Sequence, residues 1–426
     1  MARIIFFWVS LLWALACAAL NEVIERLVNF EVHSNAAAVR SAQMIMLPHI
    51  EIPLEIVKAD FAKTLDLSIA QSLIFDVNGK KYVRWILNPE DTRWGEELIE
   101  YLHQKHGLKL TRKYYFHGYQ TSSRSYIAED PKTGAVFSVK SSTNVTGGIW
   151  RDKKQPVGDA IDSRLISDFL VRQNRLRPFE KLVFLEEPAI LAVKAVDQAV
   201  VIRDLGPMKD PKGKRFYLPG FSALHETTGA AIAAINGSDD PYEFWTEHYI
   251  KVAGRALGEL AARTGIQLDS PHSQNFLIEL DEKKRPTGRL VIRDLADVYI
   301  DRTMILALDG ESSPVLKRFS QSSNILDGIQ AGFGPLHGNK KPTWVTAARY
   351  SQWKDVFFKE FEASFERITG QSLSPVGAVK YQNGDYFSAS YKLSGRPEYK
   401  GFFASIKAFG YVPTPVSGRA CGAVFN

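Results

Sequence analysis

A polar cluster in the second half of the chain contains residue types that could hold a metal ion. Asn275 directly precedes an apolar run, residues 276–280, and Asp294 follows a second run, residues 290–292. Two such runs joined by a polar connection with proline and glycine predict a β-hairpin, which would bring Asn275 close to Asp294. An amide oxygen and a carboxylate suit Mg²⁺, which keeps several waters and is completed by substrate phosphates. We therefore predict a metal and nucleotide-phosphate site with Asn275 and Asp294 as ligands.

The same cluster also has a purely structural interpretation. His272, Gln274 and Asn275 can cap a turn. Arg293 and Asp294 can form a local ion pair. Spacing alone leaves both interpretations open.

A second candidate site lies upstream. Lys140, Ser142, Thr146 and Arg151 surround a pair of glycines. Hydroxyls, cations and glycines that let backbone N–H groups approach a ligand make a cradle for an anion. The alternative is a surface loop rich in Ser, Thr and Gly that binds nothing.

Arg203 is a further candidate ligand, because it ends a β-branched run at residues 199–202 and precedes Asp204. A guanidinium can bind phosphate or carboxylate through two parallel hydrogen bonds. A structural ion pair is the alternative for this residue.

Apolar periodicity predicts the elements that must position these residues. Residues 125–128 and 135–139 predict a hairpin that delivers the chain to Lys140. Residues 241–264 predict a helix, capped by Asp239 or Asp240, that leads into the polar cluster. Further helices are predicted over 21–39, 94–106, 163–174, 304–308 and 344–369, and strands over 81–87 and 199–202. We expect an α+β fold in which an antiparallel sheet carries both ligand loops and the C-terminal part is helical.

The chain of 426 residues is long enough for roughly two or three packed units. We divide it into a signal peptide (1–19), an N-terminal α/β unit (20–113), a sheet region with the nucleotide loop (114–235), a helical catalytic region with the hairpin (236–370) and a C-terminal tail (371–426).

The first residues predict export. Arg3, a long apolar centre and small residues near Ala18 are typical of a cleaved signal peptide, which implies a periplasmic or secreted protein. A lipid anchor on Cys17 and a retained anchor helix are the alternatives, and only these would attach the chain to a membrane. Cleavage would leave Cys421 as the single cysteine, so no internal disulfide is expected.

Composition excludes some classes of protein. Hydrophobic residues make up 45% of the chain and charged residues 23%, which is ordinary for a globular protein and excludes a disordered one. The formal net charge of +6 is spread along the chain, and a basic pocket for phosphate or carboxylate explains it. We find no motif for nucleic-acid binding and expect no nucleic-acid partner.

The motifs together resemble a known family. His272, Gln274 and Asn275, followed by a hairpin that ends in Arg293-Asp294, are similar to the catalytic part of the NRPS-independent siderophore synthetases, the aerobactin-type family. The segment that begins at Lys140 is similar to the nucleotide loop of that family. The resemblance covers about residues 137–301.

This resemblance implies a reaction and a set of site residues. A carboxylate is activated by ATP as an acyl adenylate and is then transferred to an amine or hydroxyl, so the implied partners are a small carboxylic acid and an acceptor. The implied catalytic residues are His272, Arg151 and Gln274; the implied nucleotide ligands are Lys140, Ser142, Thr146, Arg151, Arg203 and Gln274; and the implied Mg²⁺ ligands are Asn275 and Asp294.

Two other functions fit the same residues. A kinase-like phosphotransferase would use a similar order of basic residue, Asn and metal-binding Asp, with Asp269 as the only nearby residue to accept the substrate proton. A secreted protein without catalytic activity could keep the scaffold and bind a small anionic ligand. Release of pyrophosphate, release of ADP, or failure to bind nucleotide distinguishes the three.

Overall fold

The computed structural model describes residues 20–34, 43–122, 124–145, 152–209, 213–269, 271–319, 329–335, 340–376, 380–382 and 386–393. The predicted signal peptide, Cys421 and the loop residues Thr146 and Arg151 lie outside these ranges. Within the described ranges, no helix combines the length and the apolar character needed to cross a bilayer.

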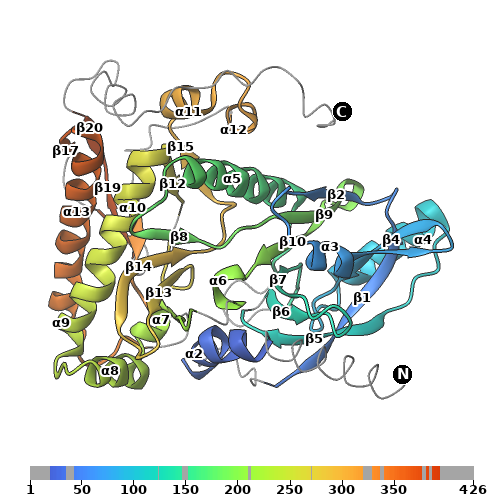
Figure 1. The fold of residues 1–426 in the computed structure, drawn as a ribbon, viewed down its shortest axis with the longest axis horizontal. Helices are drawn as coiled ribbons and strands as arrows, with labels where there is room; N and C mark the ends of the chain where they lie inside the picture. Colours follow the sequence, from blue (N-terminus) through green and yellow to red (C-terminus); the bar gives the residue numbers. More distant parts are fainter. Residues whose placement is uncertain are drawn as a thin grey trace, which may run out of the picture.

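A nine-stranded antiparallel sheet in the order β2-β9-β10-β7-β6-β5-β1-β4-β3 forms the first layer (Figure 1). Its strands are β1 (Ile45–Pro53), β2 (Lys58–Phe61), β3 (Ile74–Val77), β4 (Lys80–Ile86), β5 (Lys113–Gln120), β6 (Ser125–Glu129), β7 (Val136–Lys140), β9 (Ala189–Val193) and β10 (Gln198–Asp204). The predicted hairpin before Lys140 is confirmed, because β6 pairs with β7 and Ser125 lies opposite Lys140.

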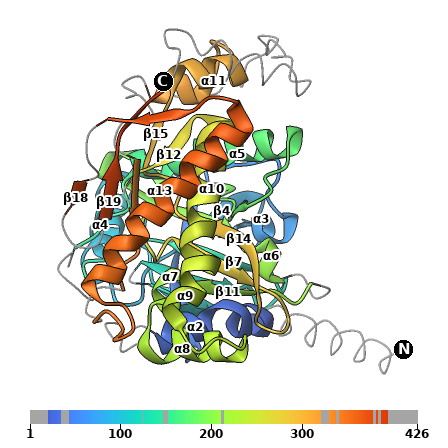
Figure 2. The same cartoon turned by 90° about the vertical axis from the view of Figure 1, so that its left-hand side faces the viewer.

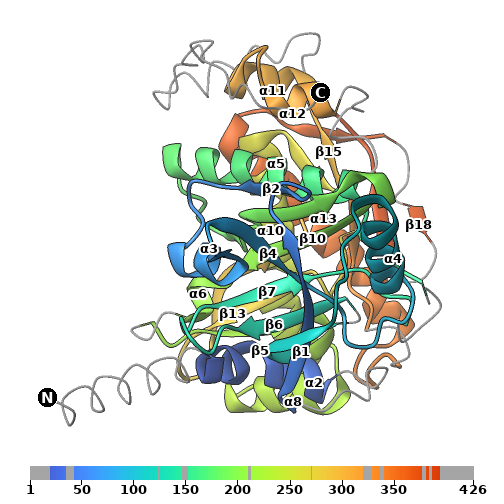
Figure 3. The same ribbon diagram turned by 90° about the vertical axis from the view of Figure 1, so that its right-hand side faces the viewer.

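Different helices cover the two faces of this sheet (Figure 3). α3 (Leu67–Leu73) and α4 (Trp94–His106) share a core with Val200 of β10, whereas α5 (Val157–Leu176) packs with Val201. Successive residues of a strand point to opposite faces, so the two neighbouring valines serve two different cores.

A four-stranded sheet in the order β11-β13-β14-β8 forms the second layer. Its strands are β8 (Leu182–Phe184), β11 (Phe216–Pro219), β13 (Phe276–Leu280) and β14 (Pro286–Ile292). β13 and β14 are the predicted second hairpin, with Phe276 opposite Ile292. β8 joins the edge of this sheet parallel to β14.

An apolar cluster joins the two sheets. The nine-stranded sheet contributes Ile127 and Val136, and the four-stranded sheet contributes Leu277 and Val291. All four side chains are buried. The face of β7 that carries Val136 also carries Lys140, because the strand alternates with a period of two. The apolar contact between the sheets therefore leads directly toward Lys140.

The predicted N-terminal helix is part of the same contact. It consists of η1 (Ile24–Val28) and α2 (Asn29–His33), and Val23 and Leu27 enter the cluster between the sheets. The helix packs against β11 and the short helix α7 (Gly220–Ala223). Burial of its apolar side is what attaches this helix to the second sheet.

Two long helices form the other side of the molecule (Figure 2). The predicted helix after residue 240 consists of α9 (Pro241–Trp245), η3 (Thr246–Ile250) and α10 (Lys251–Thr264), and α10 lies along α13 (Ala347–Thr369). A methyl group on Gly258 would stand 2.6 Å from the Phe361 carbonyl oxygen. Only a residue without a side chain permits this close approach.

The remaining elements are short. They are η2 (Lys194–Val196), α6 (Gly206–Lys209), α8 (Glu226–Ile235), β12 (Ile266–Leu268), β15 (Val298–Ile300), α11 (Arg302–Asp309), α12 (Pro314–Arg318), β16 (Ile329–Gly332), β17 (Leu373–Pro375), β18 (Lys380–Gln382), β19 (Tyr386–Ala389) and β20 (Tyr391–Leu393). The predicted α+β class, with a large antiparallel sheet and a helical C-terminal part, is confirmed. The expectation that one sheet carries both ligand loops is wrong, because Lys140 ends a strand of the nine-stranded sheet and the hairpin before Asp294 belongs to the four-stranded sheet.

Candidate functional site

Lys140 and Asp294 meet where the two sheets come together. Lys140 ends β7 and Asp294 lies just after β14, 154 positions later in the chain. The lysine Nζ lies 2.5 Å from Oδ1 of the aspartate, and the two side chains are 11% and 27% exposed. The fold thus brings together one residue from each of the two segments identified in the sequence.

Asp294 has a backbone conformation that turns it toward β7. Its φ angle is 69°, in the left-handed region that aspartate tolerates better than most residues. Arg293, its neighbour, pairs instead with Glu31 of α2, at 2.5 Å between Nη2 and Oε1. Arg293 and Asp294 therefore have separate partners, and the local ion pair considered from the sequence is not formed.

The carboxyl group of Asp294 is ionised. Burial alone would raise its pKa, but the charges of Lys140 and Arg203 outweigh burial and hold the pKa of Asp294 well below its usual range. An ionised oxygen donor in this position suits a hard cation or the ammonium that it already contacts.

The polar cluster before β13 forms a turn, as its structural interpretation required. The Asn275 N–H donates to the His272 carbonyl at 2.8 Å, and the Gln274 N–H donates to Nδ1 of His272 at 3.2 Å. Burial lowers the pKa of His272 to about 4, and the nearby cations Lys153 and Arg293 also lower it. His272 is consequently neutral near pH 7, with its proton on Nε2 because Nδ1 accepts a hydrogen bond.

This turn is fixed on several sides. The Arg293 guanidinium donates to the Gln274 carbonyl through Nε at 3.1 Å and Nη2 at 2.8 Å. The Arg293 N–H donates to the Asn275 carbonyl at 3.2 Å, which places Asn275 beside the residue that precedes Asp294. The Ser273 hydroxyl donates to the Gly334 carbonyl, and His272 forms a parallel bridge with Gly332. Both predicted metal ligands thus belong to one end of a well-supported hairpin.

The donor set is compatible with Mg²⁺ completed by a substrate. Asn275 offers an amide oxygen and Asp294 an ionised carboxylate, the oxygen donors that Mg²⁺ prefers. Among the described residues no group of three or more His, Cys, Asp or Glu could hold a metal ion. Asn275 and Asp294 by themselves would supply two oxygen donors, which is only part of the coordination shell of Mg²⁺.

The upstream loop is closed at its base by hydrogen bonds. The Ser142 hydroxyl accepts the Gln155 N–H at 2.8 Å, and Thr143 and Lys153 exchange backbone hydrogen bonds of 3.0 and 2.8 Å. Ser142 is buried and thus contributes to the shape of the loop. Thr146 and Arg151, between these two ends, lie outside the described residues.

Two cations near Lys140 were missed from the sequence. Burial lowers the pKa of Lys153, and the charges of Arg124 and Lys140 lower it further. Arg124 is held by a hydrogen bond from Nη1 to the Lys154 carbonyl, at 3.0 Å. Neither residue belongs to a recognisable motif.

We call Arg124, Lys140, Lys153 and Asp294 the charged site. The carboxyl groups of Asp159 and Asp297 also lie within range of the charge of Lys140 and offset part of the positive charge. Charges of both signs in one place suit a ligand that combines phosphate with a cation.

Arg203 has a carboxylate partner within the protein. Its Nε and Nη2 donate to Oε1 of Glu187 at 3.1 and 2.5 Å, and both side chains are buried. This geometry favours the structural ion pair that was the alternative interpretation of Arg203.

The N-terminal end of α4 anchors the base of the upstream loop. Asp152 accepts hydrogen bonds from Arg93 Nη1 at 2.6 Å and from Trp94 Nε1 at 2.7 Å. On the other side of the loop, the Thr92 N–H donates to the Asn144 side chain at 3.0 Å. None of the site residues predicted from the sequence lies in this N-terminal part of the chain.

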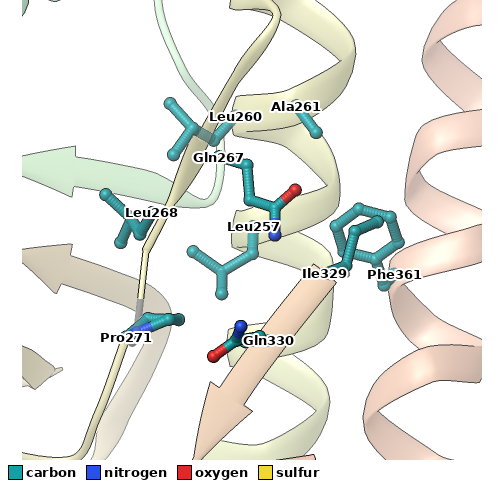
Figure 4. Close-up of a pocket in the computed structure, with 9 residues that line it drawn as sticks. All are labelled: Leu257, Leu260, Ala261, Gln267, Leu268, Pro271, Ile329, Gln330 and Phe361. Atoms are coloured by element: carbon teal, nitrogen blue, oxygen red, sulfur yellow. The ribbon is translucent and has the colours of Figure 1, made fainter. Parts of the chain in front are cut away.

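A small cavity lies behind the polar turn, between α10, α13, β12 and β16 (Figure 4). It is lined by Leu257, Leu260, Ala261, Gln267, Leu268, Pro271, Ile329, Gln330 and Phe361. The lining is mainly apolar and includes none of the predicted site residues, so this cavity is separate from the charged site.

Comparison with known proteins identifies the fold. No model of a known protein family matches the sequence, and no curated protein matches it. The petrobactin biosynthesis protein AsbB of Bacillus anthracis superposes with a TM-score of 0.53 at 12% identity, over 86% of this chain and 70% of that one. The predicted resemblance to siderophore synthetases is thereby confirmed at the level of the fold.

Two aerobactin synthetases of Klebsiella pneumoniae are more distant matches. IucC aligns at 15% identity with a TM-score of 0.46, over 67% of this chain and 53% of that one, so this chain spans about half of its length. ATP-bound IucA aligns at 11% identity with a TM-score of 0.43, over 77% of this chain and 65% of that one.

Proposed function

We propose that this protein is an ATP-dependent ligase that activates a small carboxylic acid as an acyl adenylate and transfers the acyl group to an amine or hydroxyl. The observation that carries the proposal is the 2.5 Å contact between Lys140 and Asp294. It joins the segment that begins at Lys140 to the hairpin proposed to hold Mg²⁺, the two segments on which the resemblance to siderophore synthetases rests. The fold shared with the petrobactin biosynthesis protein supports the same function.

The nucleotide phosphates would bind on the cationic side of the charged site. Lys140, Arg124 and Lys153 supply positive charge there. Thr146 and Arg151 of the adjoining loop would add a hydroxyl and a guanidinium. A triphosphate carries negative charge that such cations can bind.

His272 and Gln274 would orient the reacting groups. Since burial lowers the pKa of His272 to about 4, its imidazole acts as a neutral hydrogen-bond donor through Nε2. Such a donor stabilises charge on a phosphate oxygen without first having to bind a proton. Ser142 would contribute mainly by fixing the loop through its hydrogen bond from Gln155.

Asn275 and Asp294 would hold Mg²⁺. When bound, the ion neutralises phosphate charge and polarises the phosphorus under attack. The low pKa of Asp294 keeps this ligand ionised over the physiological range. Lys140 can then contact phosphate as well as the carboxylate, because an ammonium group has three donors.

The proposed reaction has two steps. A carboxylate oxygen of the acid attacks the α-phosphorus of ATP, the bond from that phosphorus to the bridging oxygen breaks, and pyrophosphate leaves. The acceptor nitrogen or oxygen then attacks the acyl carbon, loses its proton to solvent, and AMP leaves. Lys140 and the neighbouring cations stabilise the negative charge that develops on the phosphate oxygens.

Mass spectrometry of the nucleotide products tests this function. The purified protein is incubated with Mg-ATP, mixed small carboxylic acids and mixed amines. Pyrophosphate and AMP, formed only when an acid is present, are the expected products. ADP would identify a phosphotransferase instead, and unchanged ATP without measurable binding would refute nucleotide chemistry.

A further inference from the structure

Two buried glutamates hold the residues on either side of Asp294. Glu31 of α2 lies 2.5 Å from the guanidinium of Arg293. Glu187, which follows β8, accepts the Leu295 N–H through Oε2 at 3.3 Å. Asp294 is therefore fixed through the residue before it and the residue after it.

The contact with Glu31 stabilises more than one ion pair. Glu31 is 1% exposed and Arg293 7%, so separating the pair would leave a buried charge without its partner. Because the same guanidinium also donates to the Gln274 carbonyl at 2.8 Å, α2 supports both the end of β14 and the polar turn. The N-terminal helix thus acts on both halves of the hairpin end.

The contact with Glu187 is equally constrained. One carboxylate oxygen, Oε1, accepts from Arg203, and the other, Oε2, accepts from the Ser163 hydroxyl as well as from the Leu295 N–H. The Glu187 N–H in turn donates to the Ser167 hydroxyl at 2.9 Å. A carboxylate held from α5 and β10 is a rigid acceptor for the backbone that follows Asp294.

The backbone of Asp294 needs this support. A residue with a side chain is disfavoured in the left-handed region, where the φ angle of 69° places Asp294. Such conformations persist where the surroundings determine them, and they concentrate at functional sites.

We propose that Glu31 and Glu187 are positioning residues that hold Asp294 in its left-handed turn, with its carboxylate directed at Lys140. The role of Asp294 as a Mg²⁺ ligand rests on the proposed function. The support of Asp294 by Glu31 and Glu187 does not depend on that function. It also gives the N-terminal helix a role in the site, although none of its residues was a candidate from the sequence.

Acylation of Lys140 in the intact protein, followed by peptide mass spectrometry, tests the positioning without requiring any activity. An ammonium ion-paired with a carboxylate reacts slowly, and loss of the partner frees it. Asp294→Asn is the reference for complete loss, and we expect it to speed acylation of Lys140 about tenfold. Lys209, which pairs with Asp204 at 2.8 Å, is the internal reference within each sample.

We expect Glu31→Gln and Glu187→Gln to speed acylation of Lys140 about threefold or more, toward the rate seen in Asp294→Asn. Glu31→Asp keeps the negative charge and should slow acylation again, part of the way to the wild-type rate. Glu259→Gln is the matched control. Glu259 is also fully buried, pairs with Arg263 at 3.0 Å and accepts backbone N–H groups. The Glu259→Gln variant should therefore have a lower melting temperature but an unchanged rate of Lys140 acylation.

Wild-type rates for Lys140 in folded Glu31→Gln and Glu187→Gln, with a fast rate in Asp294→Asn, would overturn the proposal. So would an Asp294→Asn rate equal to that of the wild type. If Glu31→Gln does not fold, Ser163→Ala serves beside Glu187→Gln, because it removes one hydrogen bond from Glu187. A wild-type Lys140 rate in both of these variants would equally count against the proposal. Failure of the wild type to bind Mg-ATP would reject the proposed function while leaving these rates to decide the positioning.

Discussion

The contact between α10 and α13 is buried, the charged site is partly buried, and different forces hold them. In the helix contact, Gly254 and Gly258 let the α10 backbone approach the carbonyls of Phe357 and Phe361. Stability there comes from apolar area and close packing. At the charged site, Lys140 and the other cations face a carboxylate, and stability depends on each charge having its partner.

This difference predicts which property of a residue matters in each region. The helix contact is sensitive to volume, because there is no space for an added methyl group at Gly258. The charged site is sensitive to charge, since Asn has nearly the shape of Asp but cannot compensate the partly buried cation of Lys140. Four experiments can sharpen or break the comparison.

The largest effect is expected from Asp294→Asn. The change keeps shape and tolerates the φ angle of 69°, but it removes the charge beside Lys140. We expect Mg-dependent ATP affinity, measured by calorimetry, to fall about 100-fold, on the order of 3 kcal/mol. Glu282→Gln, an exposed loss of the same charge in the same hairpin, should bind normally. Normal affinity in Asp294→Asn would reject the metal and phosphate assignment.

Gly258→Ala should destabilise the helix contact. Its methyl group would stand 2.6 Å from the Phe361 carbonyl oxygen, so we expect the free energy of unfolding in urea to fall by about 1 to 3 kcal/mol. Gly158→Ala is the control, since its methyl group would meet only the flexible end of Arg318 at 3.3 Å. ATP affinity of the folded Gly258 variant should be unchanged, and a large loss would show that the two regions are coupled.

Protonation of His272 should make the stability of the protein depend on pH. The pKa of His272 falls from 6.5 to about 4 on folding, so the unfolded chain binds more protons between these values. Stability therefore decreases as the pH falls from about 6.5 to about 4, by at most about 3 kcal/mol for this group. We expect His272→Gln to flatten that part of the stability profile and to weaken ATP binding.

His49 provides the matched control for this experiment. Burial lowers its pKa to about 4 as well, but it lies on β1 of the nine-stranded sheet, with its ring against Phe116. His49→Gln should flatten the same part of the profile and leave ATP affinity unchanged. If His272→Gln and His49→Gln changed ATP affinity equally, His272 would have no specific role in nucleotide binding.

The smallest effect is expected from Asp152→Asn, which weakens the contact of α4 with the base of the upstream loop. The Asp152 contact with Arg93 is largely exposed, so stability should change by less than about 0.5 kcal/mol. Looser anchoring should raise the KM for ATP about threefold with little change in kcat. Steady-state kinetics measure both quantities. An unchanged KM would show that the contact of α4 with the loop does not contribute to ATP binding.

Local pattern was sufficient for most of the elements. α4 spans residues 94–106 as predicted and ends at Gly107, which has a φ angle of 68°. Asp240 caps α9, also as predicted, by accepting the Tyr242 N–H. Both hairpins formed between the expected runs, because strand alternation and turn residues are encoded within about ten neighbouring positions.

The candidate site was predictable only where its residues lie in short motifs. Lys140, Asn275 and Asp294 were found because each follows or precedes an apolar run. Arg124 and Lys153 had no such context, and their role follows from the pairing of β6 with β7 and the closure of the loop. The difference is physical, since a ligand at the end of a strand leaves a local pattern and a charge contributed across a sheet does not.

By itself, the amino-acid sequence determined the hairpins, the long helices and the apolar runs that lead to Lys140 and to Asp294. The tertiary structure alone decided that these segments meet, that Arg203 belongs to Glu187, and that the N-terminal helix supports Asp294 through Glu31. Helix and strand periodicity depends on near neighbours along the chain, whereas buried charges find partners through packing of distant segments, and no local signal records that choice.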